Sequence, residues 1–330
     1  MTLETRMKAI VQDRYGPTDV LELREVAKPT PVENQVLVRV HAASLNAYDW
    51  HFMRGDPYLA RMTMGLGSPK LKIRGRDFAG VVEDVGSGVT GIQIGDEVYG
   101  EVDGTLAEYA CVPEAMIGPK PSNLTFEQAA AVPLAANTAL TCLRDAANLQ
   151  PGQHVLINGA SGGVGTFAVQ LAKAFGAEVT GVCSTRNVEL VRSLGADNVI
   201  DYSQEDFTKN GRQYDVVFDL VGNRSLGEFR SALTPVGTLI LSGGGVSDGG
   251  SLVGPMGLMI KGRAMALFIK QRVLVPMAAQ STANLAALRE LIEAGKLTPA
   301  IDRTYKLSEA AEALRYLEME HARAKVVVTV

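Results

Sequence analysis

The sequence contains few of the residues from which disulfide frameworks and metal clusters are built. It has three cysteines and four histidines in 330 residues. Cys111, Cys142 and Cys183 are odd in number and far apart along the chain, which argues against a disulfide framework. We therefore expect a reducing compartment, the cytoplasm.

Long apolar runs and an excess of one charge sign are also missing. No stretch approaches the roughly 18 uninterrupted apolar residues of a membrane span, and residues 1–11 carry scattered charge where a signal peptide has an apolar core. The net charge is only −4, so neither a nucleic acid nor a membrane is expected as partner. With 46% hydrophobic and 21% charged residues, the composition is that of a globular protein acting on a small molecule.

Hydrophobic patterning divides the chain into two parts. The first contains short β-branched runs separated by glycine, proline and aspartate turns, typical of a partly open β-barrel. From about residue 125 onward, strands alternate with helical segments, which indicates βαβ units and a parallel sheet. We expect residues 264–270 to add an edge strand, and residues 326–330 to form a last strand that returns to the first domain.

The most specific motif is a glycine-rich turn between a buried strand and a helix. Residues 155–173 read VLINGASGGVGTFAVQLAK. Gly162 and Gly163 allow the backbone to approach a pyrophosphate, and Gly165 allows the helix to pack closely against the strand. The helix N-terminus then offers free N–H groups to the phosphates, so Ser161 and Val164 join the expected contacts. The alternative is a turn needed only for tight packing.

The end of the next strand indicates which nicotinamide cofactor is bound. An NAD-selective site has an acidic residue there, about 20 residues after the glycines. This chain instead places Ser184 and Arg186 there, whose hydroxyl and guanidinium suit the 2′-phosphate of NADPH. The alternative is that Ser184 only caps the following helix and Arg186 is only solvated.

Together these motifs resemble the medium-chain dehydrogenase/reductase superfamily and, within it, the zinc-independent quinone oxidoreductases. The resemblance covers essentially the whole chain. It implies an α/β fold with a GroES-like β-barrel domain, residues 1–124 completed by 271–330, and a Rossmann domain with a doubly wound parallel sheet, residues 125–270. The active site would lie in the cleft between them. The motifs are LNAYD at 45–49 with Arg54-Gly55, GRDFAGVV at 75–82, GDEV at 95–98, GTLAEY at 104–109, GASGGVG at 159–165, LGAD at 194–197 and DY at 201–202.

The resemblance raises the question of zinc, because zinc-dependent relatives use a Cys, a His-Glu pair and a further Cys or Asp. The matching positions here are Asn46, Arg76-Asp77 and Leu134. Arginine cannot ligate a cation and leucine has no donor atom, so we expect no metal. A structural zinc would need four cysteines near residues 95–121, where the sequence has only Cys111. Arg76 and Asp77 are expected to form a local ion pair.

Without a metal, a quinone or an enone is the easier hydride acceptor, because its negative charge spreads onto a distant oxygen. The resemblance places residues 46–58 on the substrate side of the cleft. Tyr58 and His51 are candidate proton donors there, and Asn46 is a candidate catalytic donor. In the alternative reading, Tyr58 covers apolar surface, His51 is packed, and Asn46 and Asp49 shape the backbone turn.

Further cofactor contacts are implied by the resemblance alone. The alternative for the glycines among them is ordinary loop geometry after strands. The residues are Thr138, Tyr202, Val221, Gly222, Ser242, Gly243 and Lys325.

Three functions therefore stay open. The first is an NADPH-dependent quinone or enone oxidoreductase that forms homodimers, as the resemblance implies. The second is an enoyl-thioester reductase, for which Lys70, Lys72 and Arg74 could form a basic entrance. The third is a non-catalytic, NADPH-binding scaffold or regulatory protein.

Overall fold

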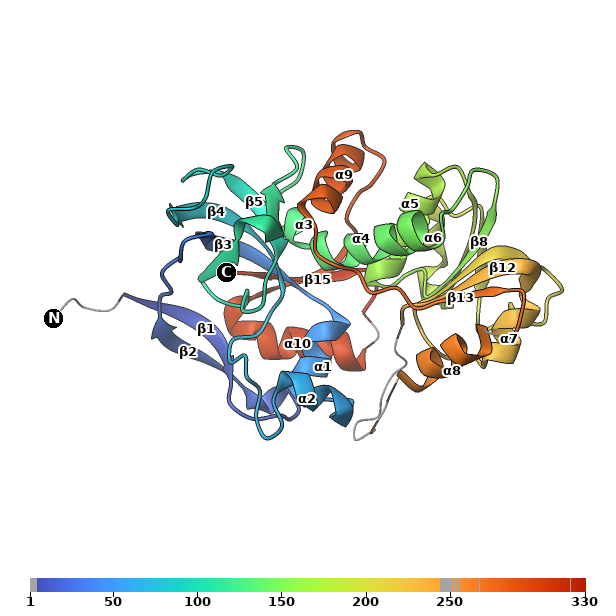
Figure 1. Ribbon diagram of the computed structural model, residues 1–330, viewed down its shortest axis with the longest axis horizontal. Coiled ribbons are helices and arrows are strands. Elements are labelled where there is room, and N and C mark those ends of the chain that lie inside the picture. Colours follow the sequence, from blue (N-terminus) through green and yellow to red (C-terminus); the bar gives the residue numbers. More distant parts are fainter. Residues whose placement is uncertain (1–4, 244–251, 253, 255, 267, 321) are drawn as a thin grey trace. The chain divides into compact units, whose positions relative to one another are not determined.

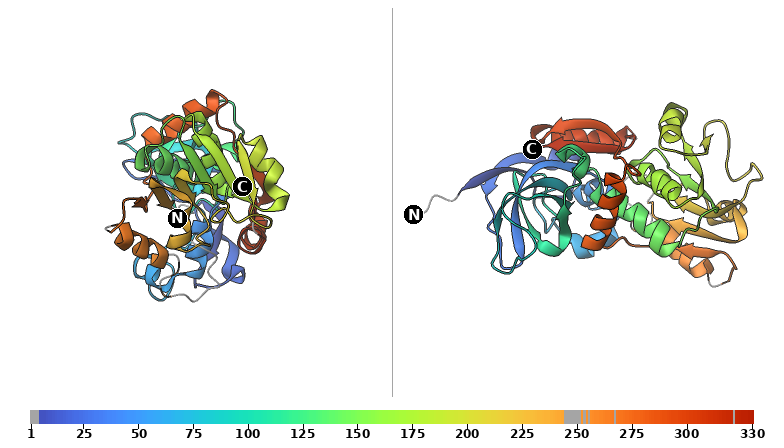
Figure 2. Two further views of the ribbon diagram at one scale, coloured as in Figure 1. Left: turned by 90° about the vertical axis from the view of Figure 1, so that its right-hand side faces the viewer. Right: turned by 90° about the horizontal axis from the view of Figure 1, so that it is seen from above.

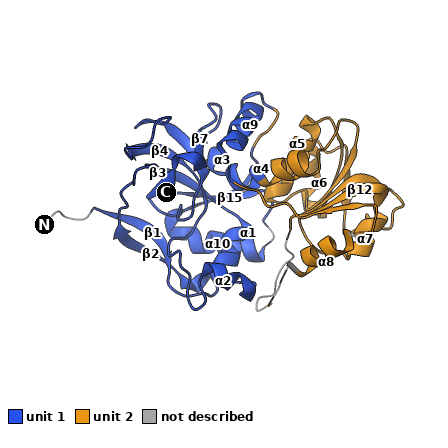
Figure 3. Ribbon diagram, viewed as in Figure 1, with its two compact units in different colours: residues 1–137, 280–295, 299–330 blue, residues 138–279, 296–298 orange. Residues whose placement is uncertain are grey.

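The computed structural model describes residues 5–243, 252, 254, 256–266, 268–320 and 322–330. The chain forms two compact units (Figure 3). Unit 1 comprises Met1–Asn137, Gln280–Gly295 and Pro299–Val330, and unit 2 comprises Thr138–Ala279 and Lys296–Thr298. These divisions lie beyond the expected boundaries at 124/125 and 270/271. Helix α3 (Phe126–Ala130) explains part of the difference, because it packs on strands of the barrel, with Phe126 stacked on His41 at 4.4 Å.

Unit 1 is built around a β-barrel-like sheet in the strand order β14-β15-β3-β4-β5-β7, with β6 also paired to β3 (Figure 1). The hairpin β1-β2 forms a separate sheet, and isolated bridges join it to Ala107 and Ile73 between the strands of the larger sheet. The strands are β1 (Arg6–Gln12), β2 (Leu21–Ala27), β3 (Gln35–Leu45), β4 (Asp77–Val85), β5 (Glu97–Glu101), β6 (Tyr109–Pro113), β7 (Ile117–Pro119), β14 (Ile301–Lys306) and β15 (Lys325–Thr329). The helices are α1 (Ala47–Arg54), α2 (Arg61–Met64), α3, α9 (Thr282–Glu293) and α10 (Ala310–Met319).

The C-terminal strand completes unit 1. β15 pairs antiparallel with β3, with Val326 opposite Leu45, so the predicted return of this strand to the first domain is confirmed. This pairing places Lys325, the first residue of β15, beside the point where β3 ends and α1 begins. The neighbouring side chains Ala43, Leu45, Val326 and Val328 are buried in one apolar cluster, which stabilises this register.

Unit 2 contains a parallel sheet in the order β10-β9-β8-β11-β12-β13, the doubly wound arrangement. Helices α5 and α6 cover one face, and α7 and α8 the other (Figures 1 and 2). The strands are β8 (His154–Asn158), β9 (Glu178–Cys183), β10 (Asn198–Asp201), β11 (Tyr214–Asp219), β12 (Leu233–Leu241) and β13 (Arg272–Leu274). The helices are α4 (Pro133–Leu140), which crosses the division between the units, α5 (Gly163–Ala174), α6 (Val188–Ser193), α7 (Leu226–Ser231) and α8 (Met256–Ala266).

The interior of this sheet follows from its sequence. In β8 and β9 every residue after the first is buried, as expected for parallel strands covered on both faces. The expected edge strand at 264–270 is wrong, because α8 extends to Ala266 and the edge strand is β13, Arg272–Leu274; residue 267 lies outside the described residues. Among the described residues, no helix is long and apolar enough to cross a membrane.

Candidate active site

The glycine-rich turn lies between β8 and α5, as predicted. Gly162 is the N-terminal cap of α5 in extended conformation, and no side chain of the described residues caps this helix end. The first N–H groups of α5, which include those of Gly163 and Val164, are therefore available to an anion. A Cβ on Gly165 would lie 2.1 Å from the carbonyl oxygen of Gly159, so the helix approaches the turn more closely than any other residue would allow.

The turns after neighbouring strands pack against one another at the carboxyl edge of the sheet. A Cβ on Gly159, after β8, would lie 2.9 Å from Val221, after β11. A Cβ on Gly243, after β12, would lie 2.0 Å from the carbonyl carbon of Leu220. Because β8 and β11 flank the point where the strand order reverses, this edge is where doubly wound sheets bind ligands.

Sequence reasoning missed the polar residues that shape this edge. Asn158, the last residue of β8, donates hydrogen bonds to Asp219 at 2.8 Å and to Asn223 at 3.0 Å. The carboxylate of Asp219, the last residue of β11, also accepts from the backbone N–H groups of Val221 and Gly222. Burial raises the pKa of Asp219, and these donors oppose that rise. The available signal was a polar residue ending each of two buried strands.

The residues proposed to select the cofactor follow β9. Ser184 is half-buried and Arg186 is exposed. Asn187, which sequence reasoning also missed, donates to the hydroxyls of Ser161 at 3.0 Å and Ser184 at 3.2 Å, and so joins the glycine-rich turn to the loop after β9. Tyr202, after β10, is 55% exposed.

One carboxylate lies close to this loop. Asp201, the last residue of β10, accepts a hydrogen bond from the hydroxyl of Thr185 at 2.6 Å, and this bond lowers the pKa of Asp201. Ser203 donates to the same carboxylate through its backbone N–H and its hydroxyl. Hydroxyl donors of the same loops therefore stabilise the negative charge of Asp201.

Unit 1 contains a buried polar cluster at the positions that correspond to the zinc ligands of related enzymes. Asp77 accepts hydrogen bonds from Ser44 at 3.0 Å, from the amide of Asn46 at 2.9 Å and from the backbone N–H of Leu134 at 3.1 Å. The ammonium of Lys325 lies 2.5 Å from Asn46 Oδ1 and 3.4 Å from Asp77 Oδ2. Lys325, predicted as a cofactor contact, is thus 1% exposed and bound to two side chains of unit 1.

The expected ion pair between Arg76 and Asp77 is wrong. Arg76 instead pairs with Glu101 at 3.2 Å and Asp103 at 3.0 Å, whereas Asp77 pairs with Lys325. Asp77 already accepts hydrogen bonds from Ser44, Asn46 and Leu134 and faces the ammonium of Lys325, so Arg76 pairs with the other nearby carboxylates. Burial raises the pKa of Glu101 to about 7, and Arg76 opposes that rise.

Helix α1 begins with a capping box. The backbone N–H of Asn46 donates to Asp49 Oδ2 at 2.8 Å, and Asp49 is buried. Burial raises the pKa of Asp49 to about 7, helped by the nearby charge of Asp77. Asp49 therefore makes the predicted contact that shapes the turn. The side chain of Asn46 makes a separate contact, with Asp77.

The two candidate proton donors differ in their surroundings. His51 stacks on Trp50 at 3.7 Å, and its Nδ1 lies 3.0 Å from the carbonyl oxygen of Asp56. Burial lowers the pKa of His51, which favours the neutral ring. A carbonyl can only accept a hydrogen bond, so Nδ1 is the nitrogen that carries a proton. Tyr58 is 45% exposed, and Arg61 lies over its ring at 4.6 Å. Tyr58 is therefore the better candidate to donate a hydrogen bond to a ligand, because it is exposed whereas the Nδ1 of His51 faces a backbone carbonyl.

The basic entrance expected for an enoyl-thioester reductase is not a continuous surface. Arg74 is 4% exposed, and burial lowers its pKa. Lys72 lies 3.8 Å from Asp13, and Lys70 is exposed. The prediction that Arg74 contributes to an entrance is therefore wrong, because its side chain belongs to the interior.

The remaining cofactor residues are placed individually. Thr138 lies on α4 and is half-buried. Ser242 and Gly243 follow β12, and the N–H of Ser242 donates to the carbonyl of Asp219 at 3.0 Å. Their contacts with a cofactor stay predictions.

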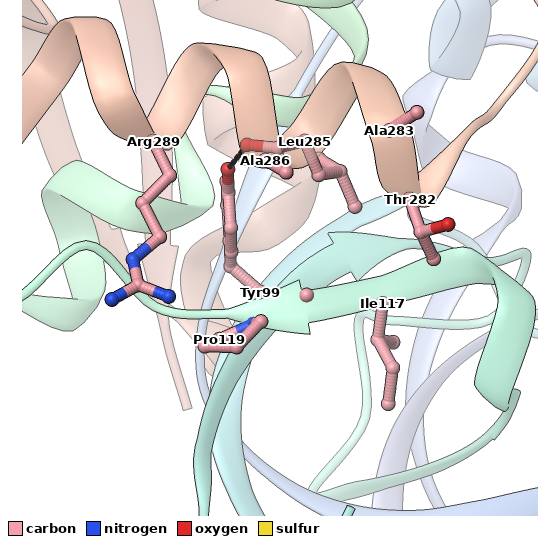
Figure 4. Close-up of a pocket in the computed structure, with 9 residues that line it drawn as sticks. Tyr99, Ile117, Pro119, Thr282, Ala283, Leu285, Ala286 and Arg289 are labelled. Carbon is pink, nitrogen blue, oxygen red and sulfur yellow. Dashed lines mark hydrogen bonds between the residues drawn. The ribbon is translucent and has the colours of Figure 1, made fainter. Parts of the chain in front are cut away.

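A cavity of about 390 Å³ lies elsewhere in unit 1, between α9 and the strands β5 and β7 (Figure 4). Tyr99 extends from β5 along this cavity and donates a hydrogen bond to the carbonyl of Leu285 at 2.6 Å. None of the predicted site residues lines it. Among the described residues, no group of three or more His, Cys, Asp or Glu side chains is arranged to hold a metal ion.

Comparison with known proteins agrees with this architecture. The alcohol dehydrogenase GroES-like domain family matches residues 32–122, and the zinc-binding dehydrogenase family matches residues 194–328. The chain is similar to the mitochondrial NAD(P)H oxidoreductase RTN4IP1 of Mus musculus, with 37% identity over 99% of this chain and 90% of the relative.

Two further similarities are equally extensive. The chloroplastic NADPH-dependent alkenal/one oxidoreductase of Arabidopsis thaliana is 36% identical over 99% of this chain and 80% of its own. The solved quinone oxidoreductase of Coxiella burnetii is 34% identical with a TM-score of 0.84, covering 99% of this chain and all of the other. The predicted family and fold are confirmed. This chain belongs to the medium-chain dehydrogenase/reductase superfamily, in its quinone oxidoreductase-like branch.

Proposed function

We propose that this protein is an NADPH-dependent oxidoreductase that reduces quinones or α,β-unsaturated carbonyl compounds without a catalytic metal. The observation that carries the proposal is the uncapped N-terminus of α5 at the reversal point of the parallel sheet. Relatives named for NAD(P)H, for alkenals and enones, and for quinones support the reaction class.

The residues of unit 2 fit a dinucleotide. The N–H groups of Gly163 and Val164 would hold the pyrophosphate, and Ser184 and Arg186 would hold the 2′-phosphate. Tyr202 would flank the adenine end, and Val221, Gly222, Ser242 and Gly243 the nicotinamide half. Thr138 would contact the nicotinamide. When bound, NADPH supplies the hydride.

The donor chemistry at the former metal positions supports a metal-free reaction. Asn46, Asp77 and Leu134 offer one carboxylate, already bound to four donors, and one amide oxygen, already bound to the ammonium of Lys325. A divalent cation would have to displace that ammonium, because otherwise two like charges would share one buried site. The acceptor oxygen would instead receive hydrogen bonds from Asn46 and Tyr58.

The oxidoreductase is favoured over the thioester reductase by the burial of Arg74, which removes one of the cations expected at the entrance. The experiment that tests the proposal measures oxidation of NADPH and of NADH with quinones, enones, enoyl thioesters and simple ketones. Turnover of quinones or enones with NADPH preferred supports it. Faster turnover of enoyl thioesters, or tight NADPH binding without any turnover, contradicts it and supports the corresponding alternative.

We also propose a homodimer and a cytoplasmic location. Exposed apolar side chains on unit 2, with Phe268 at 86% and Met277 at 88%, support an interface with a second copy. Sedimentation of the purified protein tests the homodimer, and fractionation of the source cells tests the cytoplasmic location. Relatives include mitochondrial and chloroplastic proteins, so recovery in an organelle fraction would contradict the cytoplasmic location.

A further inference from the structure

The ammonium of Lys325 is buried in a place where a charge is costly. Its side chain is 1% exposed, and the residue before it, Ala324, has a positive φ of 59°, a conformation that alanine rarely adopts. Removing an ammonium from water is unfavourable even when it is paired, and a residue held in the left-handed region adds backbone strain. The fold therefore keeps Lys325 at the end of β3 although both the burial of its ammonium and the backbone strain at Ala324 oppose this.

The partners of Lys325 fix the orientation of one carboxamide. An ammonium can only donate and a carboxylate can only accept, so Asn46 must turn its oxygen to Lys325 and its nitrogen to Asp77. Asp77 is itself held by Ser44 and by the backbone N–H of Leu134. The carboxamide has two N–H bonds and Asp77 engages one, which leaves the second as a donor in a defined direction.

The ammonium also changes the chemistry of that donor. A positive charge at the oxygen of Asn46 draws electron density from the amide nitrogen, and hydrogen bonds in such a chain strengthen one another. Asp49 and Glu101 are the other carboxylates whose charges act on Lys325 besides Asp77. Burial lowers the pKa of Lys325, and these carboxylates oppose the fall.

We propose that Lys325 is a positioning residue, which acts through Asn46 to present a polarised amide N–H to the acceptor oxygen. The inference rests on the proposed function. Reduction of the acceptor forms one C–H bond with the hydride, oxidises NADPH to NADP+ and leaves negative charge on the acceptor oxygen, which then takes a proton. The N–H of Asn46 stabilises that oxygen before the proton arrives.

The test is a double-mutant cycle with Asn46→Ala and Lys325→Met, measured as kcat and KM for a quinone or enone with saturating NADPH. Loss of one donor to a developing oxyanion lowers kcat by about 100-fold, and we expect Asn46→Ala to approach this value. Lys325→Met should lower kcat by at least about 10-fold in the wild-type background and by less than about 2-fold in the Asn46→Ala background. Losses that multiply in the double variant would overturn the inference.

Lys120→Met is the matched control. Lys120 is another paired lysine of unit 1, half-buried with a side chain that is 7% exposed, and its ammonium lies 2.6 Å from the carbonyl of Leu124 and 3.1 Å from Glu97. Its loss should lower the melting temperature without lowering kcat. A fall in kcat as large as that of Lys325→Met would show a general effect of removing a buried lysine, and would overturn the inference.

A second readout does not depend on turnover or on the folding of Lys325→Met. In the wild-type protein, the side-chain amide protons of Asn46, identified by their loss in Asn46→Ala, should exchange slowly with solvent. Lys325→Arg keeps a donor and a charge, and should retain slow exchange and most of kcat. Fast exchange in the wild-type protein would overturn the inference. Slow exchange in a protein that reduces no acceptor would contradict the proposed function alone.

Discussion

The side-chain amide of Asn158 donates a hydrogen bond to the carboxylate of Asp219 at 2.8 Å, joining the ends of β8 and β11. Because Asp219 also accepts from the N–H groups of Val221 and Gly222, one buried carboxylate sets the shape of two adjacent turns. These are the turns that the proposed function assigns to the dinucleotide. Asn158 and Asp219 thus set the shape of the proposed cofactor site, although neither side chain is proposed to contact a phosphate.

Asp219→Ala should therefore weaken both the fold and cofactor binding. It leaves several buried donors without an acceptor, and we expect a loss of about 2–4 kcal/mol in the free energy of unfolding. NADPH affinity, measured by fluorescence titration, should fall by at least about 10-fold. Asp215→Ala, at the other end of β11, removes an exposed acceptor for the N–H of His154. It should lower the free energy of unfolding and the NADPH affinity by less than Asp219→Ala does. Equal effects of the two variants would contradict the role given to Asp219.

Gly165→Ala should destabilise the protein, because the new Cβ would lie 2.1 Å from the backbone oxygen of Gly159. We expect a loss of about 3 kcal/mol in urea unfolding. Gly162→Ala is the matched control, since its Cβ would be 3.4 Å from the nearest atom and its φ is −81°. It should cost less than about 1 kcal/mol. Similar losses for both would show that the close approach at Gly165 is not the cause.

Arg186→Asp should lower the affinity for NADPH far more than that for NADH. Loss of one charge-assisted contact with the 2′-phosphate, plus repulsion by the new carboxylate, should weaken NADPH binding by about 10- to 100-fold. Arg192→Asp changes the same charge on α6, where Arg192 is exposed and pairs with Glu189 at 2.7 Å, and should leave the NADPH to NADH ratio unchanged. Equal losses for the two cofactors in Arg186→Asp would remove Arg186 from the 2′-phosphate site.

Asp49→Asn tests the effect of burial on one carboxyl. Burial raises the pKa of Asp49 from about 3.8 to about 7, so between these values the native state binds more protons than the unfolded state. The contribution of Asp49 to stability is thus largest below the lower value and is lost as the pH rises through about 7. The full loss is at most about 4 kcal/mol.

The measurement is the free energy of unfolding at pH 5 and pH 8, values on either side of about 7. Asn keeps an acceptor for the N–H of residue 46 but cannot ionise, so Asp49→Asn should lose less stability than the wild type as the pH rises. Glu101, whose pKa burial also raises to about 7, contributes to the slope of both proteins. Asp19→Asn, an exposed substitution, is the control. Parallel curves for wild type and Asp49→Asn would contradict the account.

Features that depend on local sequence could be predicted. The glycine-rich turn, the buried strands β8 and β9 and the N-terminus of α5 follow from residues that are neighbours in the chain, and the structure has them where expected. The edge strand expected at 264–270 is wrong, because a short apolar run is compatible with either a helix or a strand, and residues 264–266 form the end of α8.

Features that depend on distant residues could not be predicted. Lys325 and Asn46 are separated by 279 positions, and Asn158 and Asp219 by 61. The family pattern indicated that the zinc ligands were replaced, but not that a lysine from the last strand would pair with Asp77. That contact depends on the register of β15 against β3, which a single sequence does not specify.

The central claim is a metal-free, NADPH-dependent reduction, and the most direct measurement combines both parts. Purified protein is dialysed against a chelator, its zinc content is determined, and the oxidation of NADPH and NADH by a quinone and an enone is followed. The account predicts far less than one zinc per chain, full activity after chelation and a preference for NADPH. Activity that disappears with the chelator and returns with zinc, or a preference for NADH, would contradict it.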